Sequence, residues 1–574
     1  MFFRKLHYGA TALLLSLAVI AQAQTPQDVI RAVEQNNRIQ QENNERLRRE
    51  QQEKQSQPQA SPEVGVPVTS TPSLPVAPVG NASCHDVKEV VLQGASQLSK
   101  KEQEKITAPF VGRCLTLADI NSLLAAITNA YVAKGMVTTR AYIAPQDMSS
   151  GVLELLVVEG RVDKLLLEDG RKNNSVSLAT AFPRVTGKLL DLRDLEQGLD
   201  QLNRLASNNA TMDIQPGSGI GASTVVIRNQ PRRIWSAGAS VDNYGSKSTG
   251  INQLGVNAAL YNLTRLNDMI TLSQNRSFPY SRPGIGQVAN AASFSLPYGY
   301  YTFTLSWSDS EYQSLVNGSA GTFDTTGSSG QTTAKIDRVI YRGTAGRGAL
   351  SLDLTTKESR NYVLGQLIAT SSRDLTIANL GGNFVTGVGG GGLTLELAYS
   401  QGLTILDAEE DQVGLPDFVP RAQFKRINYG FTWNRPFTAW SQSFSFNSQL
   451  QGQYGLDALF SSEQISVGSF YSVRGFRETS LAGDRGAYIR NDLSLNLPLN
   501  LRWNPFLRPF IGLDAGTVNE RLGNPGGTLA GMAVGASLGV GRASFDLTTT
   551  RPLHVPSDMR REQFYTFMRA SYSL

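Results

Sequence analysis

Residues 301–307 read YTFTLSW, and every second side chain in this stretch is large and apolar. The positions between them carry only threonine and serine. Because successive side chains of a β-strand point to opposite faces of a sheet, the alternation predicts a strand with one apolar and one polar face. The same pattern recurs far downstream, in residues 393–400 (LTLELAYS) and residues 492–499 (DLSLNLPL).

Segments of this kind continue through residues 232–574 with scarcely a helical pattern between them. A transmembrane barrel needs such strands, apolar toward lipid and polar toward the lumen, whereas a β-sandwich core would give a similar alternation. The length of the region favours the membrane, as do aromatic residues at positions suited to interfacial girdles: Tyr301, Trp307, Phe444 and Tyr572. At about 21 residues per strand and connection, the region predicts sixteen strands. We therefore expect a membrane all-β protein with a 16-stranded transmembrane β-barrel.

The N-terminus has the features of a secretory signal peptide over residues 1–23. Arg4 and Lys5 precede an apolar run, which ends in the small-x-small sequence Ala21-Gln22-Ala23. No later run approaches the roughly 20 apolar residues of a membrane-spanning helix. Export would place Cys84 and Cys114 in an oxidising compartment. A disulfide between them is the expected state, with two free buried thiols as the alternative.

Residues 24–56 predict a helix that is polar nearly all round, because they are rich in helix formers and lack an apolar stripe. Such a helix is either solvated or lodged in a wet, polar cavity, and a disordered polar tail is the alternative. Residues 57–83 form a proline-rich linker. Proline at this density gives a semi-extended spacer of about 3 Å per residue. The helix could therefore dock far from the domain that follows.

Residues 84–160 and 161–231 each show short strands alternating with amphipathic helices, in the same β-α-α-β-β order. Leucine and isoleucine recur at three- and four-residue steps in the helices expected at 116–134 and 192–205. We expect two α+β units, each with helices on one face of a small sheet. Such a sheet leaves an edge that can accept an extended strand of another chain.

Composition argues against an enzyme. The chain has three histidines, one of them in the removable segment, and two cysteines, which leaves little material for His-based catalysis or a zinc cage. We expect no catalytic site, no cofactor and no metal. The formal net charge of +5 comes from basic residues spread along the chain without an aromatic-basic cluster, so no nucleic-acid partner is expected. Residues 217–221 and 245–248 are better interpreted as turns than as phosphate loops.

One long stretch, about residues 455–484, interrupts the strand pattern. It contains the sequence Val473-Arg474-Gly475-Phe476. A later strand places an acid and three other residues on the lumen-facing side: Phe510, Gly512, Asp514 and Gly516. If the loop folds inward, Arg474 and Asp514 can form a charge-assisted pair that anchors it. The alternative is that both are ordinary solvated charges.

The whole order of segments, with the Val473–Phe476 loop and the Phe510–Gly516 strand, resembles the outer-membrane transporters of two-partner secretion. The similarity covers essentially the entire mature chain and points to the haemolysin secretion/activation and contact-dependent inhibition branch of Gram-negative bacteria. These proteins belong to the superfamily of outer-membrane barrels with polypeptide-transport-associated (POTRA) domains. The resemblance implies a sixteen-stranded barrel, two POTRA domains in the periplasm, an N-terminal plug helix threading the pore, and Arg474 reaching Asp514 inside it. One departure is the last residue, Leu574, where barrel proteins commonly end in an aromatic.

The same resemblance implies a function and partners. The expected activity is translocation of a large exoprotein, such as a haemolysin, adhesin or contact-dependent inhibition toxin, which carries an N-terminal secretion domain. Further expected partners are outer-membrane lipid and the barrel-assembly machinery, and the chain is expected to be a monomer. An outer-membrane barrel-protein assembly factor would use the same modules and remains the alternative. A passive porin would not need the POTRA pair.

Overall fold

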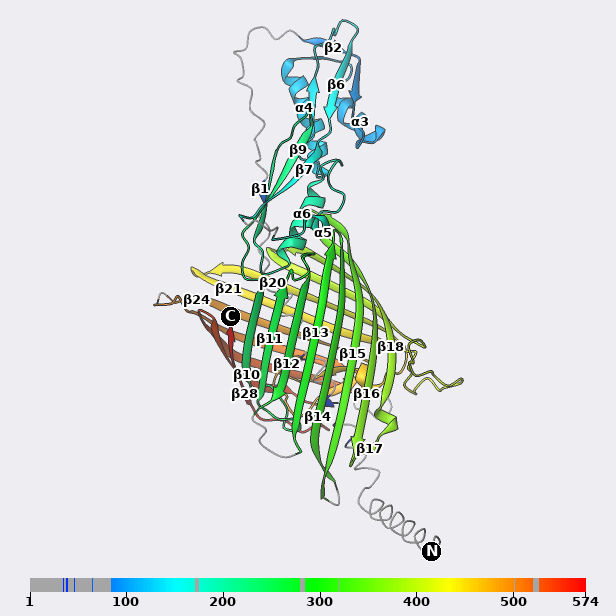
Figure 1. Cartoon of the computed structure of the whole chain (residues 1–574), viewed down its shortest axis with the longest axis vertical. Helices are drawn as coiled ribbons and strands as arrows, with labels where there is room; N and C mark the ends of the chain where they lie inside the picture. The colour runs from blue at the N-terminus through cyan, green and yellow to red at the C-terminus, as the bar shows by residue number, and fades with distance from the viewer. Residues whose placement is uncertain are drawn as a thin grey trace.

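The computed structural model describes residues 84–170, 175–278, 284–318, 321–499, 501–519 and 526–574, together with residues 64–65 and five helical residues nearer the N-terminus: Ala32, Gln35, Arg38, Ile39 and Arg46. The signal peptide expected at residues 1–23 lies outside the described residues, as does most of the polar helix and of the linker. Two small α+β units are stacked at one end of a long barrel (Figure 1). We call that end of the barrel the near end and the opposite end the far end. Among the described residues, no helix is both long and apolar enough to cross a membrane.

The first unit is a three-stranded sheet covered by two helices. The sheet has the order β3 (Glu89–Gln93), β6 (Val152–Val158), β5 (Arg140–Ile143), and a separate ladder joins β2 (His85–Val87) to β4 (Arg113–Leu115). The helices are α3 (Lys100–Thr107) and α4 (Leu117–Ala133). Their apolar faces and the sheet enclose a core that includes Leu123, Ile127 and Leu155, all fully buried.

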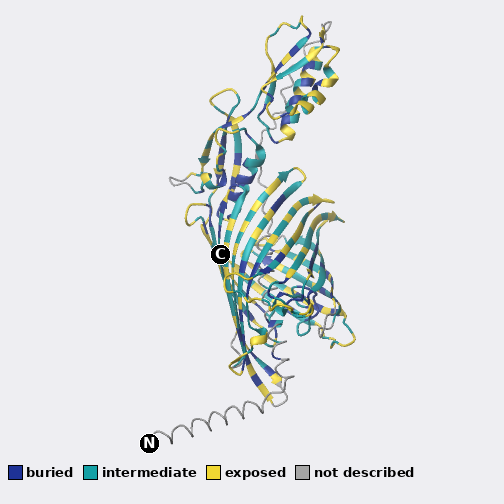
Figure 2. Ribbon diagram, turned by 90° about the vertical axis from the view of Figure 1, so that its right-hand side faces the viewer, coloured by how far each residue is buried: buried dark blue, intermediate teal, exposed yellow. Residues whose placement is uncertain are grey.

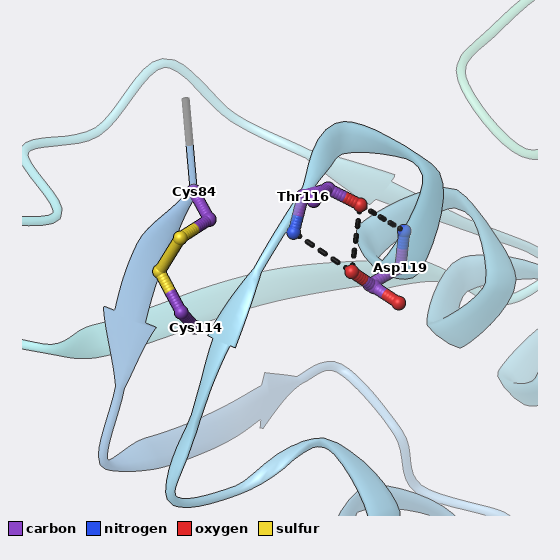
Figure 3. The surroundings of a disulfide bond; sticks show 4 residues. All are labelled: Cys84, Cys114, Thr116 and Asp119. Atoms are coloured by element: carbon purple, nitrogen blue, oxygen red, sulfur yellow. Dashed lines mark hydrogen bonds between the residues drawn. A yellow bond between two sulfur atoms is a disulfide. The ribbon is translucent and has the colours of Figure 1, made fainter. Parts of the chain in front are cut away.

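Helix α4 begins at a capping box that lies next to a disulfide (Figure 3). The Thr116 hydroxyl accepts from the backbone N–H of Asp119 at 3.3 Å, and the Asp119 carboxylate accepts from the backbone N–H of Thr116 at 2.8 Å. These contacts satisfy two of the helix's unpaired N-terminal amides. Two residues earlier, Cys114 is bonded to Cys84, with the two Cα atoms 5.3 Å apart. The disulfide expected from the sequence is confirmed.

The second unit consists of β7 (Arg161–Glu168), α5 (Leu178–Ala181), α6 (Leu192–Asn203), β8 (Ala210–Pro216) and β9 (Ala222–Asn229). Its sheet has the order β1-β8-β9-β7. The first of these strands, β1 (Val64–Gly65), comes from the linker and runs parallel to β8, with Val64 opposite Met212 and Gly65 opposite Asp213. The sequence predicts that each small sheet leaves an open edge, but part of the β8 edge is paired with the chain's own linker.

Sixteen long strands of the described chain form a closed barrel, as expected. In chain order they are β10 (Trp235–Asp242), β11 (Gln253–Tyr261), β12 (Met269–Ser277), β13 (Gly286–Tyr298), β14 (Tyr301–Gly318), β15 (Gly321–Gly343), β16 (Gly346–Val363), β18 (Arg373–Val388), β19 (Gly391–Leu403), β20 (Lys425–Ala439), β21 (Gln442–Gly455), β24 (Arg485–Pro498), β25 (Phe506–Val518), β26 (Gly527–Val540), β27 (Ala543–His554) and β28 (Tyr565–Ser573). Neighbouring strands are antiparallel, and β28 closes the barrel against β10.

The alternation in the sequence corresponds to the two faces of the barrel wall. Phe303, Leu305 and Trp307 are 41%, 54% and 47% exposed and point outward, whereas Tyr312 and Ser314 of the same strand are buried on the lumen side. More and less exposed positions alternate in this way along most strands (Figure 2). An apolar exterior and a polar interior are what a barrel in lipid requires.

The second unit is hydrogen-bonded to the near end of the barrel. Gln197 and Gln201 of α6 both donate to the carbonyl oxygen of Gly299, at 3.1 and 3.0 Å, in the turn between β13 and β14. Arg204 donates to Ser295 at 2.6 Å and to the carbonyl oxygen of Asn267 at 2.8 Å. Two barrel turns and strand β13 are thus bound to α6 and to the residue that follows it, which fixes the second unit on the barrel.

Candidate functional site in the barrel lumen

The long loop between β21 and β24 leaves the far end of the barrel and folds back into the lumen, where Arg474 meets Asp514. Arg474 is 2% exposed and Asp514 4%. The guanidinium donates through Nε and NH2 to the two carboxylate oxygens, at 2.6 and 2.7 Å, and the backbone N–H of Arg474 donates to the same carboxylate at 3.0 Å. A second carboxylate, Asp492 of β24, accepts from NH2 at 2.6 Å. The planar fork of arginine suits this bidentate arrangement.

Glycines make room for the arginine. A Cβ at Gly512 would lie 2.3 Å from the Arg474 NH2 atom, and a Cβ at Gly531 would lie 1.6 Å from the Arg474 carbonyl oxygen. Gly475 has a φ of +112° and faces the backbone of Arg551 so closely that a Cβ would approach its carbonyl carbon to 2.7 Å. Any larger residue at these three positions would displace the loop. Sequence reasoning included Gly512 and Gly475 but missed Gly531, which lies on β26.

The remaining motif residues surround the ion pair. Val473 and Phe476 are fully buried and pack with Val467, Leu481 and Leu529. The Arg474 guanidinium lies 5.8 Å from the centre of the Phe510 ring. A Cβ at Gly516 would lie 2.6 Å from Val467, so the loop approaches the wall closely there too. The structure therefore brings the loop-tip residues and the wall residues named from the sequence into one cluster.

A second ion cluster, which sequence reasoning missed, holds the start of the loop. Glu463 is 2% exposed and pairs with Lys357 of β16 at 2.7 Å and with Arg426 of β20 at 2.8 Å. Its backbone carbonyl accepts from Arg426 and from Gln453, at 2.8 and 2.9 Å. The loop is thus bound to the barrel wall at two separate places. The sequence shows an acidic residue in the loop and basic residues at inward-facing strand positions. Their spacing along the chain does not indicate which of them form ion pairs.

A third contact ties the loop to the segment between β27 and β28. The Glu562 carboxylate accepts from the backbone N–H groups of Arg477, Glu478 and Thr479, at 3.1, 3.1 and 2.7 Å. Successive N–H groups that converge on one anion form an anion-binding nest. The carbonyl oxygens of this peptide remain available on its other side.

The described residues of the polar N-terminal helix contact those carbonyls and the lumen wall. Arg38 donates to the carbonyl oxygens of Arg477, at 2.8 Å, and of Glu478. Arg46 pairs with Asp242 of β10 at 3.1 Å. Further contacts involve lumen-facing residues: Gln35 donates to Ser314, and Ala32 packs with Val316, Phe323 and Val363. These helical residues therefore lie inside the barrel, in contact with the loop and with strands on more than one side.

Comparison with known proteins gives a consistent picture of the domains. A family model described as haemolysin secretion/activation protein ShlB/FhaC/HecB matches residues 221–538. Models of a ShlB-type POTRA domain and of a POTRA domain match residues 85–160 and 161–216.

Relatives and solved structures are similar over most of their length. The outer membrane transporter CdiB of Dickeya dadantii is 31% identical, with 91% of each chain covered. The hemolysin transporter protein ShlB of Serratia marcescens is 32% identical, with 84% of each chain covered. The solved structure of CdiB from Escherichia coli is 30% identical and superposes with a TM-score of 0.84, covering 96% of this chain and 99% of the other.

Proposed function

This chain belongs to the haemolysin secretion/activation family and is an outer-membrane transporter of two-partner secretion, with its POTRA domains in the periplasm; from that premise we propose how its lumen is closed and opened. The polar helix is the resting plug, and the long loop is a fixed part of the wall beside it. The observation that carries this proposal is the pair of hydrogen bonds from Arg38 to the carbonyls of residues 477 and 478. They join the plug directly to the loop.

The plug is held by contacts that can be broken without exposing a large apolar surface. Of its five described residues, three make charged or amide hydrogen bonds, such as Arg46 with Asp242 and Gln35 with Ser314. When the helix leaves, lumen water can hydrate both partners of these contacts. Breaking them then costs less than separating buried apolar surfaces. The plug can therefore leave and return on its linker. Polar side chains in the lumen can hydrogen-bond to the backbone amides of a passing chain without binding any one sequence tightly.

The loop, in contrast, stays in place. Removing one partner of a buried ion pair leaves an uncompensated charge, which costs about 3–5 kcal/mol. The loop has two such clusters, at Glu463 and at Arg474. We assign Arg474 and Asp514 the role of loop anchor, with Val473, Gly475 and Phe476 as its tip and Phe510, Gly512 and Gly516 as its socket. No catalytic, cofactor or metal role belongs to these residues in this proposal.

The exoprotein is first captured by the POTRA sheets. An extended segment of the secreted chain adds to a free sheet edge through main-chain hydrogen bonds. Strand β8 is paired over two residues with Val64–Gly65 of the linker, so a client at that edge competes with the linker. Displacing the linker frees the segment that tethers the plug. Client binding and plug release are then coupled through one strand.

Secretion of the cognate exoprotein tests the transport function on which this proposal rests. Deletion of the gene should remove that exoprotein from the medium while other outer-membrane barrels remain at normal levels. A general loss of barrel proteins with continued export would instead identify an assembly factor. Export that proceeds normally without this chain would refute both.

A further inference from the structure

We propose that the crevice between the second POTRA domain and the outer barrel wall binds the headgroup of an anionic phospholipid in the periplasmic leaflet. The crevice encloses a cavity of about 240 Å³. It is lined on the domain side by Pro183, Arg184 and Lys188 and on the barrel side by Tyr298, Tyr301 and Arg338. We call it the rim pocket.

The rim pocket opens toward lipid and not toward the lumen. Tyr298 of β13, Tyr301 of β14 and Arg338 of β15 stand opposite one another in the strand register. Further along these strands, the residues of the same parity include Phe303 and Ile336, which are 41% and 43% exposed on the outer wall. The pocket therefore lies where the apolar band meets the near-end turns, at the depth of the lipid headgroups.

The pocket carries an excess of positive charge. Arg184, Lys188 and Arg338 are exposed, and within the described ranges none of them pairs with a carboxylate. One acid, Asp194, also lines the cavity, and its carboxylate accepts from the Tyr300 hydroxyl at 2.6 Å. Three cations against one acid leave a net charge of +2. Basic pockets at a membrane surface attract anionic headgroups, at about 1 kcal/mol per cation.

The walls of the rim pocket are held in place by contacts within the protein, without a ligand. Gly299, in the turn between Tyr298 and Tyr301, donates to the carbonyl of Thr180 at 2.8 Å and accepts from two glutamines of α6. A Cβ at Gly299 would lie 2.8 Å from Pro183, so the domain and the turn are in close contact. Arg338 lies 5.2 Å from the centre of the Tyr301 ring, which restricts its position. A prearranged site loses less entropy on binding.

The geometry fits a lipid and not a free anion. The phosphate diester would lie among the three cations, and tyrosine hydroxyls are suited to its glycerol oxygens. The acyl chains would then continue along the outer wall past Phe303 and Ile336, which a free phosphate could not cover. Bound lipid would add to the contacts that already hold the second POTRA domain on the barrel at this place.

Native mass spectrometry of the full chain in detergent, titrated with phosphatidylglycerol, tests this. We expect the wild type to retain phosphatidylglycerol in preference to phosphatidylcholine. The variant R184Q/K188Q/R338Q should bind phosphatidylglycerol on the order of a hundredfold more weakly, from about fivefold per cation. The matched control R233Q/R502Q/R542Q removes three exposed cations from the same end of the barrel, two of which also lie over tryptophan rings. It should bind as the wild type does.

Equal weakening in both variants would show general surface attraction and overturn the proposal. Equal retention of the two lipids by the wild type would overturn it as well. Displacement of phosphatidylglycerol by millimolar inorganic phosphate would identify a simple anion site instead. Heat-modifiable gel mobility of each variant verifies that its barrel is folded. Because lipid retention is measured without an exoprotein, failure here leaves the plug proposal intact.

Discussion

Arg474 and Asp514 are separated by 40 residues in the sequence, and their side chains meet in the lumen through two hydrogen bonds of 2.6 and 2.7 Å. Each comes from a different part of the fold, one from a loop and one from a strand. The pair therefore forms only when the loop has turned inward, and it holds the loop there. Asp492 adds a second acceptor for the same guanidinium.

Charge reversal tests this anchor. R474D should abolish export of the exoprotein, because it places three carboxylates together in a buried site. The double variant R474D/D514R should restore part of the export, which is measured as exoprotein in the culture medium. R560D, at an exposed position in the segment between β27 and β28, is the control and should export normally. Normal export by R474D would remove the anchor hypothesis.

Gly531 offers a test that changes no charge. G531A would bring a methyl group to 1.6 Å from the Arg474 carbonyl oxygen, so the loop tip must move. We expect the loop to become accessible to protease in outer-membrane vesicles and export to fall. G392A, also on a barrel strand, places its methyl group where no atom lies within 4 Å. If the two variants are indistinguishable, the close contact at Gly531 is not required.

The plug contacts predict the resting conductance of the pore. R38Q and R46Q should each raise ion conductance in planar bilayers, because the helix is then held by fewer contacts. Deletion of residues 27–56 should raise the conductance further, because the helix is then absent. D242N removes the partner of Arg46 and should reproduce the effect of R46Q. Unchanged conductance after the deletion would eliminate the plug hypothesis.

The disulfide should stabilise the first POTRA domain. Cys84 and Cys114 are separated by 30 residues, and closing such a loop contributes about 3.5 kcal/mol in the chain-entropy model. We expect C84A/C114A to lower the protection of α4 amides against hydrogen exchange by a corresponding factor in the full chain. T116A removes only the helix cap and should cost about 1 kcal/mol. Equal protection with and without the disulfide would contradict the expectation.

The linker strand predicts competition at the β8 edge. V64P/G65P removes both backbone N–H groups of β1, so the linker can no longer donate to β8. The variant should crosslink more readily from β8 to the exoprotein. The control V79P/G80P makes the same change at another Val-Gly pair of the linker. An equal increase in both variants would show that linker stiffness, and not the β8 edge, is responsible.

Much of this architecture was predictable because its signals are local. The alternation around Tyr301 and the spacing of Leu195 and Leu199 each reflect a single element whose apolar face must be buried or face lipid. The Arg474–Asp514 pair could be proposed because both residues stand in motifs that resemble a known family. Composition and periodicity alone could not distinguish this ion pair from two separate, solvated charges.

The missed contacts are those that depend on register across the barrel. Glu463 finds Lys357 and Arg426 only after the strands have closed and the loop has folded inward. Gly531 matters because β26 happens to pass under the carbonyl of Arg474. The strand Val64–Gly65 is too short to leave a pattern, and it lies in a proline-rich segment where pairing is not expected.

The peptide groups that join residues 477, 478 and 479 have an arginine on one side and a glutamate on the other. Arg38 binds the oxygens of both groups, and Glu562 binds their N–H hydrogens. A cation at one end of an amide increases the polarity of the other end, so each contact strengthens its opposite. When the plug helix leaves, the hydrogen bonds from these N–H groups to Glu562 should therefore weaken. A change that begins on the periplasmic side would then alter the segment around Glu562 at the cell-surface end of the barrel. A fluorophore near Glu562 that does not respond to loss of Arg38 would exclude such signalling.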